Sequence, residues 1–491
     1  MEDINILIKQ RLEKAEELKK DGHNLFKYNF DKKQSIDEIQ NKYKDVKQKE
    51  SGFAKTAGRI MIKRLHGKSG FADLKDESGE IQLYFRKDFV GDEKFSLFKK
   101  LDIGDIVGVE GTLFRTKTNE LTIVVKKFDL LTKSFRPLPE KFHGLQDKEI
   151  RYRQRYVDLI VNDDVKETFK TRSKILSNIR KYMEENNYIE VETPVLQDIY
   201  GGANATPFIT KHKTLDKDFY LRISLETYLK RLIVGGFEKV FEIGKVFRNE
   251  GIDRQHNPEF TLMEYYAAYN DLFDMMNYTE GMIKYLVKTI GFDSGIIEYD
   301  EREIDLSGDW ERLSMKKAIE KYADIKIDDK ENDKLKNIIL REDEKAELDN
   351  SSRGELIYRI FELLVEDNLI NPTFIIDFPI EVSPLAKKKR DAQKGDFVER
   401  FELFMNGWEI ANAFSELNDP HDQRERFQKQ EKKFVEGNEE AQRMDEDFIR
   451  SLEYGMPPTG GVGIGIDRLV MLFTNSKSIK DVIFFPHLKD K

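Results

Sequence analysis

The sequence predicts an α+β protein with a small β-barrel at the N-terminus and a larger domain built on an antiparallel β-sheet flanked by helices. Residues 57–132 read as short strands punctuated by glycines. Two later stretches, 240–267 and 401–420, alternate like hairpins, and the segments between them have helical periodicity. A chain of 491 residues can form two or three domains with ample core, and we expect the boundary near residue 145.

Composition and charge restrict the class of protein. Charged residues make up 36% of the chain and hydrophobic residues 39%, which is typical of a soluble globular protein. No basic leader or stretch of roughly 20 apolar residues is present, so we expect no membrane contact. The absence of cysteine excludes disulfides and fits a cytoplasmic protein. Residues 1–150 carry 31 Lys and Arg against 26 Asp and Glu, and this basic front favours a polyanionic partner.

The first domain, expected over residues 1–145, begins with a helix over residues 4–20, which Gly22 would end. Three strands, a short helix and two strands then follow in the order of an OB barrel, which binds oligonucleotides on an open face. The predicted strands are 57–66, 71–75, 81–85, 105–114 and 121–131. Phe71 is a candidate for stacking on a base, or else a core residue, and Gln82 and Glu120 are candidates for reading base edges.

The second domain, expected over residues 146–491, opens with a predicted helix over 164–187 and a strand that ends before Pro194. The loop at Gly201-Gly202-Ala203 has small residues that let backbone approach a ligand. A helix at Glu226 precedes the first hairpin. The charged region around 300–370 reads as a helical insertion on the surface.

The hairpin at 240–267 concentrates charge on one sheet face. Arg248 and Glu250 share a face of its first arm, while Phe260, Glu264 and Tyr266 share a face of the second. Burying such a face is costly unless its charges are paired or bound to a charged ligand. We therefore expect a binding surface. A solvated hairpin with cross-strand salt bridges is the alternative.

The stretch 401–420 adds a second hairpin, with a type I′ turn predicted at Asn406-Gly407. That turn makes Glu402 and Glu409 diagonal neighbours, and two such carboxylates favour Mg²⁺ that bridges to phosphate. By strict pairing, the face with Asn412, Phe414 and Glu416 lies opposite Glu409. A single pocket therefore requires a β-bulge between Glu409 and Asn412.

The stretch 460–473 combines a glycine-rich strand with a helix. Gly461, Gly463 and Gly465 leave one strand face bare, so a flat aromatic ring could lie against it. Close packing of the strand against a helix is the alternative. Arg468 lies near the positive N-terminus of the next helix, where phosphate is favoured.

Three stretches resemble, in order, motif 2, the amino-acid pocket and motif 3 of class II aminoacyl-tRNA synthetases. They are F-R-N-E-G…H-N-P-E-F, then F-S-E-L-N-D-P, then G-x-G-I-G-I-D-R. The helix and strand before Pro194 are similar to motif 1, the dimer-forming element. The OB domain is typical of the aspartyl/asparaginyl/lysyl subgroup. Residues 131–160 and E-I-A-N-A-F-S-E-L-N-D-P look specifically like lysyl-tRNA synthetases, and the resemblance covers nearly the whole chain.

This resemblance implies ATP-dependent ligation of L-lysine to tRNA(Lys) through a lysyl-adenylate, in a homodimer formed near residues 164–194. It also implies Mg²⁺, about three ions per active site. The lysine-binding residues would be Gly202, Glu226, Arg248, Glu264, Tyr266, Asn412, Phe414 and Glu416. The ATP-binding residues would be Arg248, Glu250, His256, Asn257, Phe260, Glu402, Glu409 and Arg468, with metal at Glu402 and Glu409. The anticodon would be read by Phe71, Gln82 and Glu120.

Within these sets the resemblance implies individual roles. Arg248 would hold the α-carboxylate of lysine and, with Arg468, stabilise the charge that develops at the α-phosphate. Glu416 and the Tyr266 hydroxyl would bind the ε-ammonium, and Phe414 would pack on the methylene stem. The α-ammonium would bind at Glu226, Glu264, Asn412 and the Gly202 backbone. Adenine would lie between Phe260 and Arg468.

Two positions depart from the family pattern, because Gln255 and Trp408 stand where arginine is common. Two other functions remain as alternatives. A lysine-activating enzyme that modifies a protein would lack the OB module that this chain has. A non-catalytic RNA-binding homologue would have lost ATP-binding residues such as Arg248, Phe260 and Arg468, which are all present.

Overall fold

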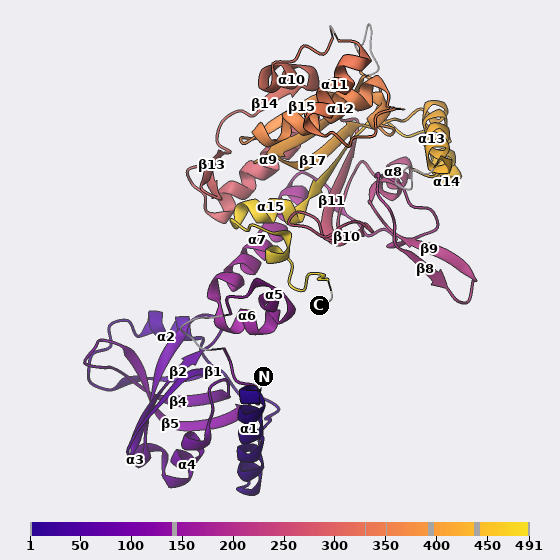
Figure 1. The fold of residues 1–491 in the computed structure, drawn as a ribbon. Coiled ribbons are helices and arrows are strands. Elements are labelled where there is room, and N and C mark those ends of the chain that lie inside the picture. The colour runs from indigo at the N-terminus through magenta and orange to yellow at the C-terminus, as the bar shows by residue number, and fades with distance from the viewer. Residues whose placement is uncertain are drawn as a thin grey trace. The chain divides into compact units, whose positions relative to one another are not determined.

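The computed structural model describes residues 2–139, 145–328, 330–349, 351–390, 397–436 and 442–489. The chain forms two compact units, Met1–Gln146 and Asp147–Lys491 (Figure 1). Residues 140–144, within the stretch 131–160 that resembles lysyl-tRNA synthetases, lie outside the described residues. No helix in the described ranges is long and apolar enough to cross a membrane.

The first unit is a closed five-stranded barrel with strand order β1-β2-β3-β5-β4, as an OB fold requires. Helix α1 ends at Lys20, two residues before Gly22, whose φ of 83° a glycine adopts at no steric cost. Strand β1 starts at Ser51, earlier than predicted. The earlier start was missed because the first three residues of the strand are exposed and carry no apolar alternation. The elements are α1 (Glu2–Lys20), α2 (Ile36–Lys42), β1 (Ser51–His66), β2 (Ser69–Lys75), β3 (Glu80–Arg86), α3 (Lys87–Val90), α4 (Asp92–Lys100), β4 (Ile106–Arg115) and β5 (Leu121–Thr132).

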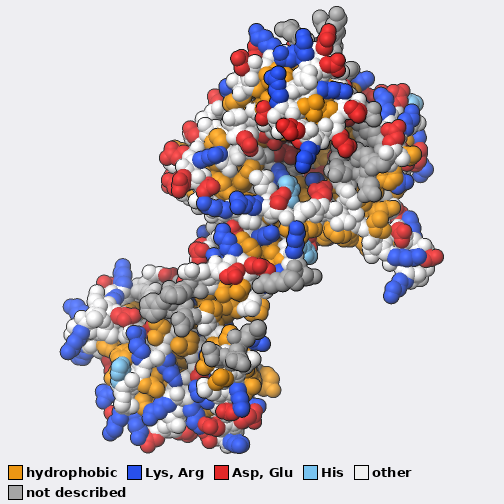
Figure 2. All heavy atoms as spheres, viewed as in Figure 1, with side chains coloured by type: hydrophobic (Ala, Val, Ile, Leu, Met, Phe, Trp, Pro, Cys, Tyr) orange, Lys and Arg blue, Asp and Glu red, His pale blue; other side chains and the backbone are white. Residues whose placement is uncertain are grey.

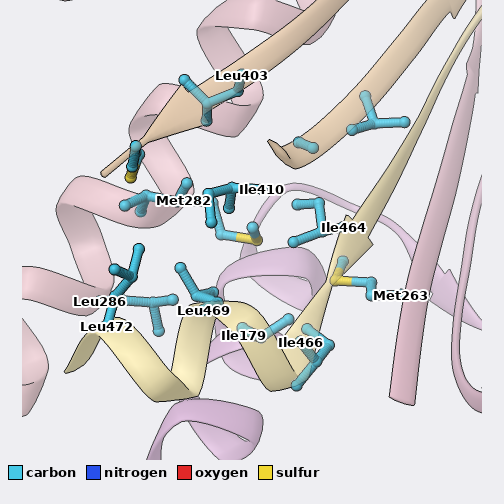
Figure 3. Close-up of a cluster of buried hydrophobic side chains, with 14 of the residues drawn as sticks. Ile179, Met263, Met282, Leu286, Leu403, Ile410, Ile464, Ile466, Leu469 and Leu472 are labelled. Atoms are coloured by element: carbon cyan, nitrogen blue, oxygen red, sulfur yellow. The ribbon is translucent and has the colours of Figure 1, made fainter. Parts of the chain in front are cut away.

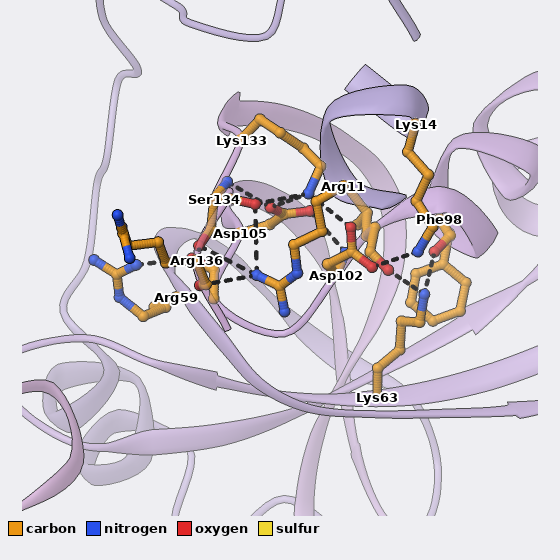
Figure 4. A network of polar contacts seen from close by, with 12 residues as sticks. Arg11, Lys14, Arg59, Lys63, Phe98, Asp102, Asp105, Lys133, Ser134 and Arg136 are labelled. Atoms are coloured by element: carbon orange, nitrogen blue, oxygen red, sulfur yellow. Dashed lines mark hydrogen bonds and ion pairs between the residues drawn. The ribbon is translucent and has the colours of Figure 1, made fainter. Parts of the chain in front are cut away.

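A polar network attaches helix α1 to the barrel (Figure 4). Arg11 donates to the Arg136 carbonyl at 3.0 Å, and the Lys14 ammonium lies 2.6 Å from the Asp102 carboxylate. The fully buried Lys133 side chain pairs with Asp102 at 2.8 Å and with Asp105 at 2.9 Å. A buried charge is stable only when it is paired and hydrogen-bonded, so this network fixes the helix in one position.

The second unit is built on an eight-stranded sheet with the order β14-β15-β16-β17-β18-β11-β10-β6. Neighbouring strands are antiparallel except for the outermost pair at each end, β14–β15 and β10–β6, which are parallel. The strands are β6 (Ile189–Glu190), β10 (Lys239–Phe247), β11 (Glu259–Ala268), β14 (Glu311–Ser314), β15 (Thr373–Pro379), β16 (Phe397–Met405), β17 (Trp408–Ser415) and β18 (Thr459–Gly465).

Three helices bury one face of this sheet: α7 (Asp163–Glu185), α9 (Leu272–Ile290) and α15 (Ile466–Phe473). Figure 3 shows Ile179 of α7, Met282 of α9 and Leu469 of α15 packed with Met263 of β11. Because side chains alternate along a strand, the residues next to Met263 point to the opposite face of the sheet. The apolar core on one face therefore leaves the other face free for a site.

The remaining elements complete the second unit. The helices are α5 (Lys148–Arg153), α6 (Arg155–Val161), α8 (Glu226–Val234), α10 (Met315–Ala323), α11 (Asn332–Glu342), α12 (Arg353–Leu364), α13 (Pro420–Val435), α14 (Glu446–Glu453) and α16 (Ile479–Val482), with 3₁₀ turns at Glu366–Asn368 and Ile380–Val382. The additional strands are β7 (Leu196–Gln197), β8 (Ile209–His212), β9 (Lys217–Leu221), β12 (Ile296–Tyr299) and β13 (Arg302–Asp305).

The region 300–370 differs from a purely helical surface insertion. It contains three helices, but its strand β14 joins the main sheet beside β15. Helices α10 and α12 bury apolar residues such as Ile319 and Phe361 against Phe378 and Phe404 of the sheet. The short strand was not predicted because four residues are too few to show a period of two.

Candidate active site

A cavity of about 480 Å³ lies on the face of the sheet opposite the helical core. It is lined by Leu262, Glu264 and Tyr266 of β11, which alternate with the core residues Met263 and Tyr265. All fifteen residues expected in the active site line this one cavity: Gly202, Glu226, Arg248, Glu250, His256, Asn257, Phe260, Glu264, Tyr266, Glu402, Glu409, Asn412, Phe414, Glu416 and Arg468. Figure 2 shows acidic and basic side chains intermingled over the visible face of this unit.

The hairpin β16–β17 contains the predicted turn and the predicted bulge. Asn406 and Gly407 have φ values of 55° and 71°, and type I′ turns need positive φ at both central residues. Leu403 pairs with Ala411 but the next residue, Phe404, pairs with Glu409, so Ile410 is the extra residue. Because Ile410 and Ala411 both pack in the core, Glu409 and Asn412 both face the cavity.

Glu264 is buried and held by its own chain. Its Oε1 accepts from the Leu225 amide at 2.9 Å and its Oε2 from the Tyr266 hydroxyl at 2.9 Å. Burial, together with the nearby Glu226 carboxylate, raises the pKa of Glu264 to about 8. Since the Tyr266 hydroxyl donates its proton to Glu264, its oxygen is left as an acceptor, which is the role that an ammonium ligand requires.

Lys230 pairs with two of the expected lysine-binding residues and was not predicted. Its ammonium contacts the carboxylates of Glu226 and Glu416, and all three side chains are buried. Burial raises the pKa of Glu416 to about 8, while Lys230 opposes that rise. The sequence holds one signal for this pair, because Glu226 and Lys230 are four residues apart on a helix, in the favourable order.

Arg248 follows β10 and has a guanidinium group open to the cavity. Its carbon Cζ lies 5.1 Å from the centre of the Phe260 ring. Among the described residues, the buried Nε of Arg248 finds no hydrogen-bond partner. Burial lowers the pKa of Arg248. A buried donor without a partner is costly, so this guanidinium suits an anionic ligand with two oxygens.

Gly202 brings backbone close to this group of residues. It has a φ of 85°, and a Cβ at this position would lie 2.0 Å from the Ser224 hydroxyl and 3.0 Å from the Glu226 Cβ. Only glycine combines that conformation with such a close approach.

Arg468 and Asp467 line the opposite end of the cavity. Arg468 donates to the Glu409 carbonyl at 2.8 Å and lies 3.2 Å from Nε2 of His256. Asp467 accepts from the Thr261 amide at 2.7 Å and pairs with Arg172 at 2.5 Å, which fixes the start of α15 against β11. These two contacts therefore hold the N-terminus of α15 in one position relative to the glycine-rich strand β18 that precedes it.

The two carboxylates that were expected to hold magnesium lie at this end of the cavity. Glu402 and Glu409 line the cavity, and burial with the nearby charges of Glu409 and Glu366 raises the pKa of Glu402 to about 8, against the effect of Arg400. Arg400, which was not predicted, lies 2.5 Å from Oε1 of Glu402. No group of three or more His, Asp or Glu side chains in the described ranges is arranged to hold a metal alone. Mg²⁺ here would need phosphate oxygens as well.

Arg400 also determines which group of Asn412 is free. Its Nε donates to Oδ1 of Asn412 at 3.1 Å. The free group of Asn412 is therefore its amide NH₂, which is a donor. It suits a carboxylate or phosphate of the substrate, whereas the resemblance implied contact with the α-ammonium.

The three expected anticodon residues lie together on the barrel of the first unit. Gln82 donates to Glu120 at 2.9 Å and accepts from Thr122 at 2.9 Å. Phe71 is half-buried and stacks on Tyr84, with ring centres 4.7 Å apart. Thr122 and Tyr84 were not predicted, because single strand residues give no sign of cross-strand partners.

Comparison with known proteins agrees with this geometry. A family model described as tRNA synthetases class II (D, K and N) matches residues 147–489, and one described as an OB-fold nucleic acid binding domain matches residues 54–131. The lysine–tRNA ligase of Halalkalibacterium halodurans is 50% identical over 99% of this chain and 98% of its own length.

Two further lysine–tRNA ligases give the same result. That of Clostridium novyi is 49% identical, over 99% of this chain and 95% of its own length. That of Methanoculleus marisnigri is 51% identical, over 98% of this chain and 94% of its own length. This chain therefore belongs to the class II tRNA synthetases of the D, K and N group, where its relatives are lysine–tRNA ligases.

Proposed function

We propose that this chain joins L-lysine to tRNA(Lys) in two steps, with ATP as the energy source. The lysine carboxylate attacks the α-phosphate of ATP, which releases pyrophosphate and forms lysyl-adenylate. A terminal ribose hydroxyl of the tRNA then attacks the adenylate, which releases AMP. The observation that carries this proposal is one cavity that combines the buried carboxylates of Glu226, Glu264 and Glu416 with Arg248, whose buried Nε has no partner among the described residues.

The cavity offers a partner for each charged group of lysine. Arg248 suits the α-carboxylate, since a guanidinium can hold carboxylate and phosphate oxygens together. Glu226, Glu264 and the Gly202 backbone suit the α-ammonium. Glu416 and the acceptor oxygen of Tyr266 suit the ε-ammonium, and Phe414 lines the wall between them.

The other end of the cavity suits ATP. Phe260 and Arg468 flank the bare face of Gly463 and Gly465, where an adenine ring fits. Within the described residues, the buried Oδ1 of Asn257 has no partner and can accept from an adenine amino group. Glu402 and Glu409 would hold Mg²⁺ jointly with the phosphates, and the ion would neutralise phosphate charge. Glu250 and His256 complete this end.

No side chain has to act as a nucleophile in this reaction. The enzyme holds the lysine carboxylate and the α-phosphate in line and stabilises the charge that develops between them. Arg248 and Arg468 are the cations that the cavity provides for this purpose. The fixed start of α15 keeps Arg468 in place before ATP arrives.

We also assign the tRNA and the second subunit to specific surfaces. Phe71, Gln82 and Glu120 would read the anticodon. A homodimer would form through residues 164–194, where the apolar side chain of Ile189 is 52% exposed.

Amino-acid-dependent exchange between ATP and pyrophosphate tests the proposal across all twenty amino acids. We expect exchange with lysine alone at low substrate concentration. Transfer of radioactive lysine to tRNA(Lys) then separates tRNA ligation from modification of a protein. Absence of lysine-dependent exchange would overturn the proposal, and exchange without transfer to tRNA would favour the protein-modifying alternative.

A further inference from the structure

Lys230 lies behind the wall of the cavity, outside the set of residues that line it. Its side chain is fully buried on helix α8, four residues after Glu226. Its ammonium contacts Glu226 and Glu416, and the Phe448 ring lies 5.9 Å away on the other side. Both carboxylates that Lys230 holds face the cavity on their other side.

The charges of the pocket balance those of lysine only when Lys230 is counted. Glu226, Glu264 and Glu416 contribute three negative charges when all are ionised, and Lys230 contributes one positive charge. The resulting net charge of these four side chains is −2, which matches the two positive ammonium groups of lysine. Each carboxylate is also held by its own chain, Glu264 by Leu225 and Tyr266, and the other two by Lys230.

We propose that Lys230 is a positioning residue that determines specificity for a substrate with two ammonium groups. This inference rests on the proposed function. The Lys230 ammonium contacts both Glu226 and Glu416 and compensates part of their negative charge, so that each carboxylate can bind one substrate ammonium. Without it, the two buried carboxylates would repel each other or share a single substrate cation.

The Lys230 ammonium does not occupy the position of a substrate ammonium, so the substrate lysine does not have to displace it. A competing side chain would line the cavity, whereas Lys230 contacts its two carboxylates from behind. The helix also fixes it, because an i,i+4 pair such as Glu226 and Lys230 forms within one turn of α8. Removal of Lys230 should therefore weaken lysine binding, and a competitor's removal would strengthen it.

Steady-state ATP–pyrophosphate exchange by the full chain tests this with Lys230→Met and the matched control Arg231→Met. Arg231 is the next cation on the same helix, but it pairs with Asp445 at 2.7 Å, away from the cavity lining. For Lys230→Met we expect the KM for lysine to rise about 30-fold or more, with the KM for ATP nearly unchanged. Arg231→Met should resemble the wild type in both constants.

Chemical rescue separates positioning from general damage. In Lys230→Ala, n-propylammonium replaces the lost end of the side chain and should lower the KM for lysine, whereas n-propanol should not. The same amine should not improve the wild type. If Lys230→Met does not fold, Lys230→Gln removes the charge but keeps a hydrogen-bond donor, and the same rise in KM is expected.

The outcomes separate the two proposals. A wild type that shows no lysine-dependent exchange overturns the proposed function. An active wild type with an unchanged or lower KM for lysine in the Lys230 variants overturns only the role of Lys230. Equal losses in Lys230→Met and Arg231→Met, with no rescue by the amine, would also overturn it, since they indicate a purely structural role for helix α8.

Discussion

Single residues of the cavity wall would distinguish lysine from other amino acids through charge under the proposed assignment. Glu416 is 1% exposed and faces the cavity, and its one cationic partner is Lys230 among the described residues. A substrate without a distal cation would leave this carboxylate desolvated and unmatched. Neutral amino acids of similar length would therefore be excluded by this desolvation cost, in addition to the contacts they fail to make.

Replacement of Glu416 by Gln should remove this discrimination. We expect the KM for lysine to rise roughly 10²-fold, because the neutral amide cannot balance the ε-ammonium. The KM for ATP should stay nearly constant, since ATP is proposed to bind at the other end of the cavity. Exchange kinetics measure both constants, with Glu298→Gln as a control at an exposed position. An unchanged KM for lysine would contradict the assignment of Glu416.

Lysine binding should strengthen as the pH rises from about 6 to about 8. In the free pocket, burial raises the pKa of Glu264 to about 8, so its carboxyl holds a proton in much of the population at neutral pH. The ammonium groups of lysine favour the ionised form, so binding releases a proton below that pKa. Calorimetry in buffers with different ionisation enthalpies measures this release. Proton uptake, or no pH dependence, would contradict the raised pKa of Glu264.

At the level of elements, strand β18 passes both of the proposed substrate sites and differs in the space that it leaves at each. At Gly461 a Cβ would lie 2.2 Å from Oε1 of Glu416 and 2.3 Å from Cε1 of Tyr266, so the lysine end has no space for a side chain. At Gly465 the nearest atom would be 3.9 Å away, on Arg468. The same glycine pattern thus lets β18 approach Glu416 at one end and leaves an open face at the other.

Replacement of Gly461 by alanine should therefore have a different effect on the kinetic constants from replacement of Gly465. Gly461→Ala should raise the KM for lysine by displacing Glu416 and Tyr266. Gly465→Ala should keep the fold intact but raise the KM for ATP, since its methyl group would occupy the proposed adenine face. Thermal unfolding and exchange kinetics measure the two effects. A higher lysine KM for Gly465→Ala, with ATP unaffected, would show that the two ends are wrongly assigned.

At the scale of the whole molecule, each of the two compact units has its own apolar core, and we propose that the chemistry and the reading of tRNA are divided between them. A fragment of residues 147–491 should retain lysine-dependent exchange, since all expected residues of the cavity lie within it. Its transfer of lysine to tRNA(Lys) should fall strongly, because Phe71, Gln82 and Glu120 are missing. A fragment that transfers lysine as well as the full chain would show that the barrel does not contribute to tRNA recognition.

Local patterns determined much of this protein without any tertiary information. Period-two alternation placed Arg248, Glu264 and Tyr266 on one face, and the pairing implied by Asn406-Gly407 required the bulge that occurs at Ile410. These predictions succeeded because strand period and turn conformation are set by residues that are neighbours in the chain. The family motifs then supplied the roles.

Only the tertiary structure decided which distant side chains meet. It paired Lys230 with Glu416, which lies on another element, and it turned the Asn412 amide outward by engaging its oxygen with Arg400. It also placed β14 in the main sheet. A sequence period shows which way a side chain points but does not show what lies opposite it, because that partner is brought there by packing of the whole domain.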